Sequence, residues 1–281
     1  ENRTWKNILP IVCSMIHLVN PLTIQTVTYI SSRSSLLATF FYLLAFYIFV
    51  QILKPAKKDA SKCKTPFLVF GFLVILYLGI ATKEIVASFP LIASIYLWLS
   101  TPKEKQKTII PKISAILFIL LAFLAYRYLQ QGNLFSLRAD PTSENTHRLL
   151  YLLSQIKVIA GYYLLKLIAP FSLNFEPDII LYKTWFHWDW FASLIILFII
   201  GIIIYRQNSY LIKFGALWFF ITLLPTSSFI PLKQLATEHR AYLPGLGFSL
   251  ILGCVFLNFR DRKNITGILF IFFILFTSSL T

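Results

Sequence analysis

Apolar runs separated by short polar loops recur from one end of the chain to the other, and no other feature limits its fold more. A backbone that crosses lipid must form its hydrogen bonds within the protein, so we expect each run to be a helix. Only 13% of the residues are charged and 57% are hydrophobic, whereas about a quarter of a typical soluble domain is charged. The sequence therefore predicts an all-α, polytopic transmembrane helical bundle in the lipid bilayer.

The apolar runs predict about nine spans, several of them shorter than the roughly 20 residues that a perpendicular helix needs to cross a bilayer. Short or broken helices are common where a protein lines a cavity at membrane depth. The predicted spans cover residues 7–19, 34–53, 66–82, 85–99, 113–130, 190–205, 211–226, 245–258 and 264–280.

The stretch 149–169 is long and apolar but carries Gln155, Lys157 and Lys166, which we expect to share one face of a helix. If this stretch lies in the membrane interface, all basic loops fall on one side of the bilayer; if it crosses, the last two face the other side. Cytoplasmic loops carry an excess of Lys and Arg, which favours an interfacial helix. The basic loops are 54–64, 100–112, 206–213 and 259–263.

The favoured arrangement places the remaining polar segments together on the non-cytoplasmic side. It also explains the formal net charge of +15 by lysine-rich loops at the cytoplasmic face, so no nucleic-acid partner is predicted. The scattered Cys13, Cys63 and Cys254 predict neither a disulfide framework nor a zinc site. The non-cytoplasmic polar segments are 20–33, 82–84, 131–190 and 226–247.

One polar constellation follows the first span, where Asn20-Pro21 precedes Gln25, Tyr29 and Arg33. Proline ends the preceding helix and exposes its neighbours. Arg33 stands at the start of the next span. It is either a snorkelling side chain at a helix end or a bidentate ligand for a phosphate group.

Lys83 and Glu84 interrupt two apolar runs and form a second constellation. Adjacent charges between hydrophobic helices are costly unless they are paired or hydrated. Two interpretations stay open. The residues form an exposed tight loop, or they form the polar wall of a cavity in which Lys83 meets an anion and Glu84 meets a hydroxyl group or a metal.

A third constellation, within five residues, consists of Glu238, His239, Arg240 and Tyr242. Histidine exchanges a proton near neutral pH, and arginine binds phosphate. An ordinary solvated loop is the alternative. A divalent metal on Glu238 and His239 is a weaker hypothesis, because two adjacent ligands are too few to define a site.

A fourth polar segment, 173–190, contains Trp185, Trp188 and Trp190. Tryptophans at the start of a span usually form the belt at the membrane–water interface, and we favour this interpretation over stacking on a sugar ring.

Three segments of the chain resemble, in the same order, one family of membrane proteins. Residues 17–47 contain NPLTIQTVTYISSR, residues 82–96 begin TKEIVASFP, and residues 214–248 end in EHRAYLPGLGF. These runs are similar to motifs of bacterial multi-pass proteins that often carry C-terminal tetratricopeptide repeats. The animal relatives of these bacterial proteins are the transmembrane and tetratricopeptide-repeat O-mannosyltransferases.

The resemblance implies a GT-C fold and the activity of a membrane glycosyltransferase, a hexosyltransferase. The expected reaction moves a sugar, such as mannose, from a polyprenyl- or dolichyl-phosphate donor to a protein or envelope-glycan acceptor on the periplasmic or lumenal side. The protein would be a multi-pass integral protein of a bacterial inner membrane, or of the endoplasmic reticulum in a eukaryote. No cofactor is expected, with a divalent metal left as an alternative.

The constellations fit this chemistry. An acceptor hydroxyl needs a base, and the departing phosphate needs cations near its growing charge. The predicted catalytic residues are Glu84, Glu238 and His239, the predicted donor-phosphate ligands are Arg33, Lys83 and Arg240, and the predicted cavity residues are Gln25, Tyr29 and Tyr242.

Two other functions stay open. One is a transporter or flippase for a lipid-linked or anionic solute, and the other is an inactive fragment. Transporters usually place ionisable residues at the bilayer midplane. Here most charges lie at the ends of spans, which favours an interfacial active site.

The chain departs from the family at Asn20, where histidine is usual, and at Ser35, at or next to which many members carry an acidic residue. Family members also begin with a further helix and an external loop whose acidic residues are assigned to catalysis. We therefore expect residues 1–281 to be a single transmembrane domain, a partial GT-C module without that first helix and loop.

Overall fold

The computed structural model describes residues 2–54, 64–108, 110–111, 113–116, 119, 148–171, 173–174, 177, 179, 181–182, 187–227 and 234–258. These residues are 86% helical and include no β-strand, which confirms the predicted all-α class. The chain divides into two compact units: a first unit of Glu1–Tyr29 with Leu137–Thr281, and a second unit of Ile30–Ser136. The single domain expected over residues 1–281 stays a prediction.

Several described helices are suited to a bilayer, and the protein is a membrane protein. Four are long and apolar enough to cross, or five if a bent helix pair near the N-terminus counts as one span. Shorter apolar helices cover Pro66–Thr82, Glu84–Ser100 and Tyr210–Leu223. The total of nine spans stays a prediction, since the runs 113–130 and 264–280 lie mostly or wholly outside the described residues.

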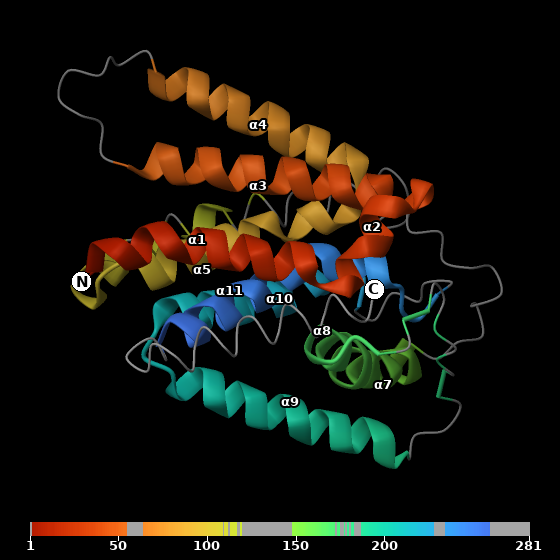
Figure 1. Cartoon of the computed structure of the whole chain (residues 1–281). Helices are drawn as coiled ribbons and strands as arrows, with labels where there is room; N and C mark the ends of the chain where they lie inside the picture. The colour runs from red at the N-terminus through yellow and green to blue at the C-terminus, as the bar shows by residue number, and fades with distance from the viewer. Residues whose placement is uncertain are drawn as a thin grey trace. The chain divides into compact units, whose positions relative to one another are not determined.

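The first unit packs its apolar helices against one another lengthwise (Figure 1). Its elements are α1 (Asn2–Val19), the 3-10 turn η1 (Pro21–Thr23), α2 (Ile24–Thr28), α7 (Arg148–Lys157), the π-helix η6 (Val158–Leu164), α8 (Leu165–Ile168), α9 (Trp188–Arg206), α10 (Tyr210–Leu223), the 3-10 turn η7 (Glu238–Ala241) and α11 (Tyr242–Asn258).

Glycine allows α10 and α11 to approach closely. A Cβ atom added to Gly215 would lie 2.7 Å from the carbonyl oxygen of Gly247, a distance that real Cβ atoms do not tolerate. Small residues at such crossings let helix backbones touch within lipid, where van der Waals packing drives association. The indole N–H of Trp218 donates to the carbonyl of Leu243 at 2.9 Å and fixes the two helices at the end where η7 lies.

The chain bends by 69° between Ile8–Val19 and Pro21–Thr28. Asn20 has extended backbone angles, and its side-chain oxygen accepts a hydrogen bond from the N–H of Leu22. Pro21 lacks an N–H and therefore cannot continue the hydrogen bonding of α1. The bend redirects the chain so that η1 and α2 contact η7.

Helices α7, η6 and α8 form one continuous helical stretch from Arg148 to Ile168. Figure 1 shows this stretch nearly end-on, whereas α1, α9 and α11 of the same unit are seen from the side. Such a crosswise direction is expected of an interfacial helix. Its length and composition would also allow a crossing, so its position in the bilayer stays a prediction.

The expectation that Gln155, Lys157 and Lys166 share one face is wrong. Gln155 is fully buried and bonds Leu235, whereas Lys157 is partly exposed and bonds Asp189 at the start of α9. Two residues separated by one position lie on nearly opposite sides of an α-helix, because each residue turns the chain by about 100°. Lys157 therefore faces away from Gln155.

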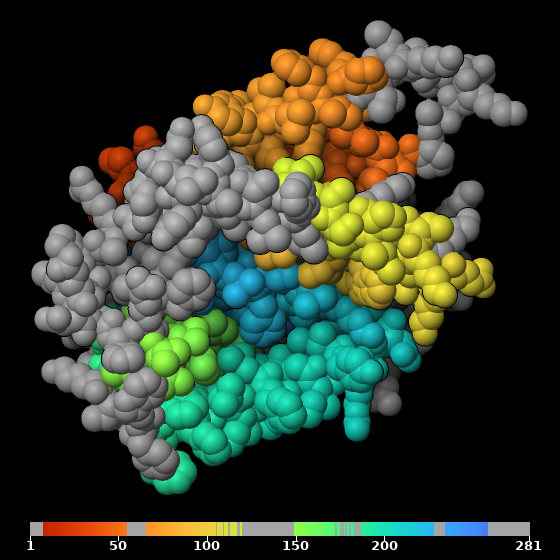
Figure 2. All heavy atoms as spheres, turned by 180° about the vertical axis from the view of Figure 1, so that it is seen from behind, coloured from red at the N-terminus to blue at the C-terminus, as the bar shows by residue number. Residues whose placement is uncertain are grey.

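Helix α9 presents apolar side chains to its surroundings along most of its length. Phe198 is 69% exposed, and only 6% of the apolar window of this helix is buried. Figure 2 shows α9, in teal, uncovered on the outer side of its unit. In a membrane protein such a face contacts lipid.

The second unit is built on the antiparallel pair α3 (Arg33–Leu53) and α4 (Lys64–Thr82). Phe46, Phe49, Phe72, Phe89 and Tyr96 form a set of edge-on and tilted ring contacts between its helices. The remaining elements are the 3-10 turns η2 (Ile30–Ser32), η3 (Glu84–Ser88) and η4 (Lys103–Lys105), and helix α5 (Phe89–Ser100).

The predicted span 85–99 is thus not one α-helix from its start. Pro90 at the beginning of α5 has no N–H to donate, and the preceding residues form a 3-10 turn instead. The hydroxyl of Tyr42 on α3 lies 3.2 Å from that of Ser88, which joins η3 to α3.

Candidate functional site

The residues singled out from the sequence fall in both units. The first unit contains Gln25, Tyr29, Tyr242 and residues 238–240. The second unit contains Arg33, Lys83 and Glu84. In the first unit the candidates lie in and next to α2 and at the start of α11, and in the second unit at the start of α3 and just after the end of α4. The convergence of both sets on one cavity stays a prediction.

Glu238 is the most buried carboxylate of the first unit's candidate site, with 4% of its surface exposed. It begins η7, directly after the extended Thr237. The hydroxyl of Tyr162 donates to Glu238 Oε1 across a long 3.5 Å, and the backbone of Asn174 also hydrogen-bonds the carboxylate. The ammonium group of Lys166 interacts with it electrostatically. A buried carboxylate needs such donors, because desolvation alone would make its charge very costly.

His239 lies between Thr237 and Gln25. Its Nε2 atom is 3.3 Å from the hydroxyl oxygen of Thr237, and its backbone N–H donates to Gln25 Oε1 at 3.2 Å. Gln25 and His239 are separated by more than two hundred residues in the chain, and the bend at Asn20 brings them together. The predicted cavity residue and the predicted catalytic residue are therefore neighbours.

Arg240 is 9% exposed, and its guanidinium group binds the turn that precedes it. Its Nη1 atom donates to the carbonyls of Gln234 at 3.0 Å and Leu235 at 3.5 Å, and its side chain also hydrogen-bonds Tyr163. These contacts give Arg240 a role in shaping the loop. Its predicted role as a ligand of the donor phosphate stays a prediction.

Two residues of the α7–η6 stretch complete this arrangement. The hydroxyl of Tyr163 accepts from the N–H of Thr237 and donates to its carbonyl, both at 3.2 Å. The amide of Gln155 donates to the carbonyl of Leu235 at 3.0 Å. We call Gln155, Tyr163 and Arg240 the turn clamp, because together they bind the backbone immediately before Glu238.

Asn20 fastens the bend that carries Gln25. It is 2% exposed, and its amide donates to the carbonyl of Leu167 at 3.2 Å while its oxygen caps η1. An asparagine side chain offers a donor and an acceptor on one planar group, so it makes both bonds at once. Asn20 therefore joins the bend to the end of α8.

Tyr29 and Tyr242 differ in their surroundings. Tyr29 ends α2 and is 41% exposed. Tyr242 is half-buried at the start of α11, where its ring meets the ring of His17 edge-on at a centroid distance of 4.9 Å. Only Tyr242 is packed directly against the α1–α11 interface.

In the second unit, Lys83 reaches the first turn of α3. Its Nζ atom donates to the hydroxyl of Ser35 at 2.5 Å. Arg33, the exposed first residue of α3, precedes Ser35 by two positions in the chain. Glu84 is half-buried and follows Lys83 as the first residue of η3. Two cations at one end of the α3–α4 pair suit an anionic ligand. Ser35 is uncharged and therefore leaves their positive charge in place.

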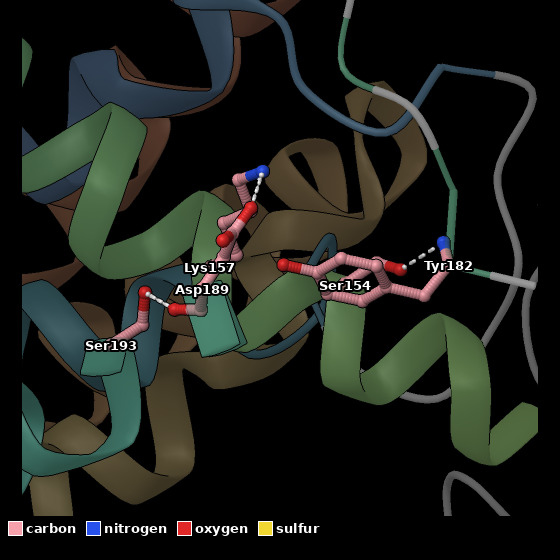
Figure 3. A network of polar contacts seen from close by, with 5 residues as sticks. All are labelled: Ser154, Lys157, Tyr182, Asp189 and Ser193. Atoms are coloured by element: carbon pink, nitrogen blue, oxygen red, sulfur yellow. Dashed lines mark hydrogen bonds and ion pairs between the residues drawn. The ribbon is translucent and has the colours of Figure 1, made fainter. Parts of the chain in front are cut away.

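A separate polar cluster joins side chains of α7 to Tyr182 and to the start of α9 (Figure 3). Lys157 Nζ lies 2.8 Å from Asp189 Oδ2, and the side chains of both are well exposed. The N–H of Tyr182 donates to Ser154 Oγ at 3.0 Å, and burial raises the pKa of the Tyr182 phenol above its ordinary value. This cluster ties α7 to the start of α9.

The interfacial belt expected for the tryptophan-rich segment 173–190 stays a prediction. Trp188 is 70% exposed, as a belt residue would be, whereas Trp185 lies outside the described residues. Within the part of the chain that the structure describes, no three His, Cys, Asp or Glu side chains gather as a metal site would require. Among the described residues, the metal site considered on Glu238 and His239 therefore has no third ligand of these types.

Sequence reasoning missed Tyr162, Tyr163 and Asn174 as neighbours of the Glu238 turn. Tyrosines within an apolar run carry no signal that separates them from ordinary core residues. Their role depends on how the 149–169 helix crosses the others, which periodicity does not predict.

No protein-family model, curated protein or solved structure matches the chain.

Proposed function

We propose that the protein is a membrane glycosyltransferase. It moves a sugar from a polyprenyl- or dolichyl-phosphate donor to a protein or envelope-glycan acceptor, on the side of the membrane opposite the basic loops. The observation that carries the proposal is the Glu238 turn: a carboxylate, 4% exposed, is held between a tyrosine hydroxyl and a backbone N–H at the polar end of apolar helices. The three sequence segments that resemble such enzymes in order add support.

The chemistry assigns a task to each kind of residue. The bond between sugar C1 and the phosphate oxygen breaks as the acceptor oxygen bonds C1, and the acceptor's proton passes to a carboxylate. Glu238 is our candidate for that carboxylate, with His239 as its neighbour in η7. The electron pair of the broken bond stays on the phosphate, where nearby cations stabilise it. In the first unit Lys166, which interacts electrostatically with Glu238, is the candidate. The expected role of Arg33 and Lys83 as ligands of the donor phosphate stays a prediction.

The test uses the protein in lipid vesicles with a radiolabelled polyprenyl-phosphate hexose, mannose first. Wild-type protein should release the label from the lipid and attach it to the acceptor. The substitution Glu238→Gln keeps the size of the side chain but removes the base, so we expect a loss of roughly 10²–10⁴-fold in transfer rate.

The matched control is Glu104→Gln, which changes an exposed glutamate in η4. It should leave the transfer rate and the amount of protein in the membrane unchanged. Wild-type protein that moves the intact lipid across the bilayer without cleaving the sugar would instead be a transporter or flippase. Wild-type protein that does neither would be inactive, and either result would reject the proposal.

A further inference from the structure

His17 is a buried histidine that the proposed chemistry has not used. It lies near the end of α1, is 6% exposed, and packs edge-on against the ring of Tyr242. One ring nitrogen hydrogen-bonds the backbone of Gly245, while Nε2 has no hydrogen-bond partner among the residues that the structure describes. Buried polar atoms nearly always have a partner, so an unpartnered one needs an explanation.

The bond to Gly245 determines what Nε2 can do. A backbone carbonyl only accepts hydrogen bonds, so the ring nitrogen that faces it, Nδ1, carries the hydrogen. In the neutral ring Nε2 is then an acceptor. The unpartnered atom therefore requires a donor, and a hydroxyl group supplies one, whereas an ionised phosphate does not.

Packing alone does not explain a histidine at this position. The hydroxyl of Ser249 also donates a hydrogen bond to the carbonyl of Gly245, at 2.9 Å. The carbonyl would therefore keep a partner if His17 were replaced. A Cβ atom added to Gly245 would lie 3.4 Å from Cε1 of the His17 ring and 3.7 Å from Cδ2 of Leu167, so the ring packs against Gly245 beside Leu167. A phenylalanine ring would fill this space without placing an unpartnered nitrogen among apolar groups.

His17 also lies next to the candidate site. Tyr242, its ring partner, directly follows η7, which carries Glu238. The hydroxyl of Thr23 in η1 donates to the carbonyl of His17 at 3.3 Å. The ring of His17 thus contacts the residue that follows η7, and its backbone carbonyl contacts η1.

We propose that His17 is a substrate-binding residue whose Nε2 accepts a hydrogen bond from one hydroxyl of the sugar delivered to the Glu238 site. This inference rests on the proposed function and adds a determinant of sugar specificity to it. In this assignment a sugar hydroxyl binds on the α1–α11 side of the site, whereas the phosphate of the donor binds to cationic side chains.

Two conservative substitutions separate the two ring nitrogens. In His17→Gln the terminal amide reaches the position of Nε2 and offers an oxygen acceptor there. In His17→Asn the shorter amide reaches only the position of Nδ1. We expect His17→Gln to keep kcat/KM within about threefold of wild type, and His17→Asn to lose roughly tenfold or more, the effect of one lost hydrogen bond to a substrate hydroxyl.

His17→Phe serves as the apolar control. It should match or exceed the thermal stability of wild type, because it removes an unpartnered buried atom, but it should lose activity as His17→Asn does. Equal kcat/KM in wild type, Asn and Phe variants would overturn the inference and leave His17 a packing residue.

A series of donor lipids, each lacking one sugar hydroxyl, identifies the bonded group. One deoxy donor should bind wild type about tenfold more weakly than the parent donor while binding His17→Phe as the parent does. If no deoxy donor behaves so, the inference fails even where transfer is normal. Binding of these donors is measured without turnover. A failure of the proposed function would appear as no sugar transfer by the wild-type protein, so the two failures are distinguishable.

Discussion

The helical stretch from Arg148 to Ile168 is held by two polar arrangements that differ in nearly every respect. On one side the turn clamp binds the loop before Glu238 through buried hydrogen bonds, with Gln155 and Tyr163 fully enclosed. On the other side Lys157 forms an ion pair with Asp189, and the two side chains are 38% and 57% exposed. Both join the same helix to a neighbour, but only the first one adjoins the candidate site.

The difference between the turn clamp and the Lys157–Asp189 pair shows that burial decides how strongly polar groups determine structure. Groups that are removed from water must be paired, so each lost bond in the clamp leaves an uncompensated partner. Exposed ions regain water when their partner is removed, and the pair contributes little. The buried arrangement should therefore set the geometry of Glu238, and the exposed one should not.

Arg240→Ala should have the largest effect on stability. It removes the donor to the carbonyls of Gln234 and Leu235 and the charge beside Tyr163. We expect unfolding to become easier by about 3 kcal/mol, the scale for breaking a buried charged contact. Thermal unfolding in detergent measures this, and Arg206→Ala, at the far end of α9, is the exposed control. A loss no larger than that of the control would contradict the clamp.

Tyr163→Phe should come next. The change removes one hydroxyl and leaves both the N–H and the carbonyl of Thr237 without that partner. The expected loss is about 1–3 kcal/mol, because these backbone groups are buried. Tyr205→Phe, an 84% exposed tyrosine on α9, is the matched control and should change nothing measurable. Indistinguishable melting of the two variants would show that the Thr237 bonds are unimportant.

Gln155→Leu should have a smaller effect than Tyr163→Phe. It loses the bond to the Leu235 carbonyl, but it also removes Gln155 Oε1, which has no partner within the described part of the chain. The two changes oppose each other, so stability should move by less than about 1 kcal/mol. A loss as large as that of Arg240→Ala would mean that the amide oxygen has a donor after all.

Lys157→Ala should be the mildest of the four. The ion pair with Asp189 is exposed, and such pairs contribute roughly 0–1 kcal/mol. Raising the salt concentration should shrink the difference from wild type further. If the variant is less stable than Tyr163→Phe at every salt concentration, the contrast between the two arrangements is wrong.

Much of the helical layout could be predicted from the sequence, because apolar length is a local property. The run 190–205 became α9, and 34–53 became α3, with ends that differ by only one or two residues. The run 211–226 ends early as α10 at Leu223. Pro225 follows soon after, and a proline has no N–H with which to continue the helix.

The site was harder to predict, because its geometry comes from contacts distant in sequence. The motif around Glu238 coincides with the turn η7, and Gln25 lies against His239. The sequence offered no sign that Arg240 would bind its own loop, or that Tyr162 and Tyr163 would approach from the crosswise helix. A guanidinium beside an acid looks the same in sequence whether it holds a loop or a phosphate.

The most direct test of the account compares two carboxylates that border the same helical stretch. Glu238→Gln and Asp189→Asn each remove one negative charge, and the transfer of labelled sugar from a polyprenyl-phosphate donor is measured in a single turnover. The account predicts a loss of roughly 10²–10⁴-fold for Glu238→Gln and nearly unchanged transfer for Asp189→Asn. Equal rates in the two variants would contradict the claim that the Glu238 turn is the active site.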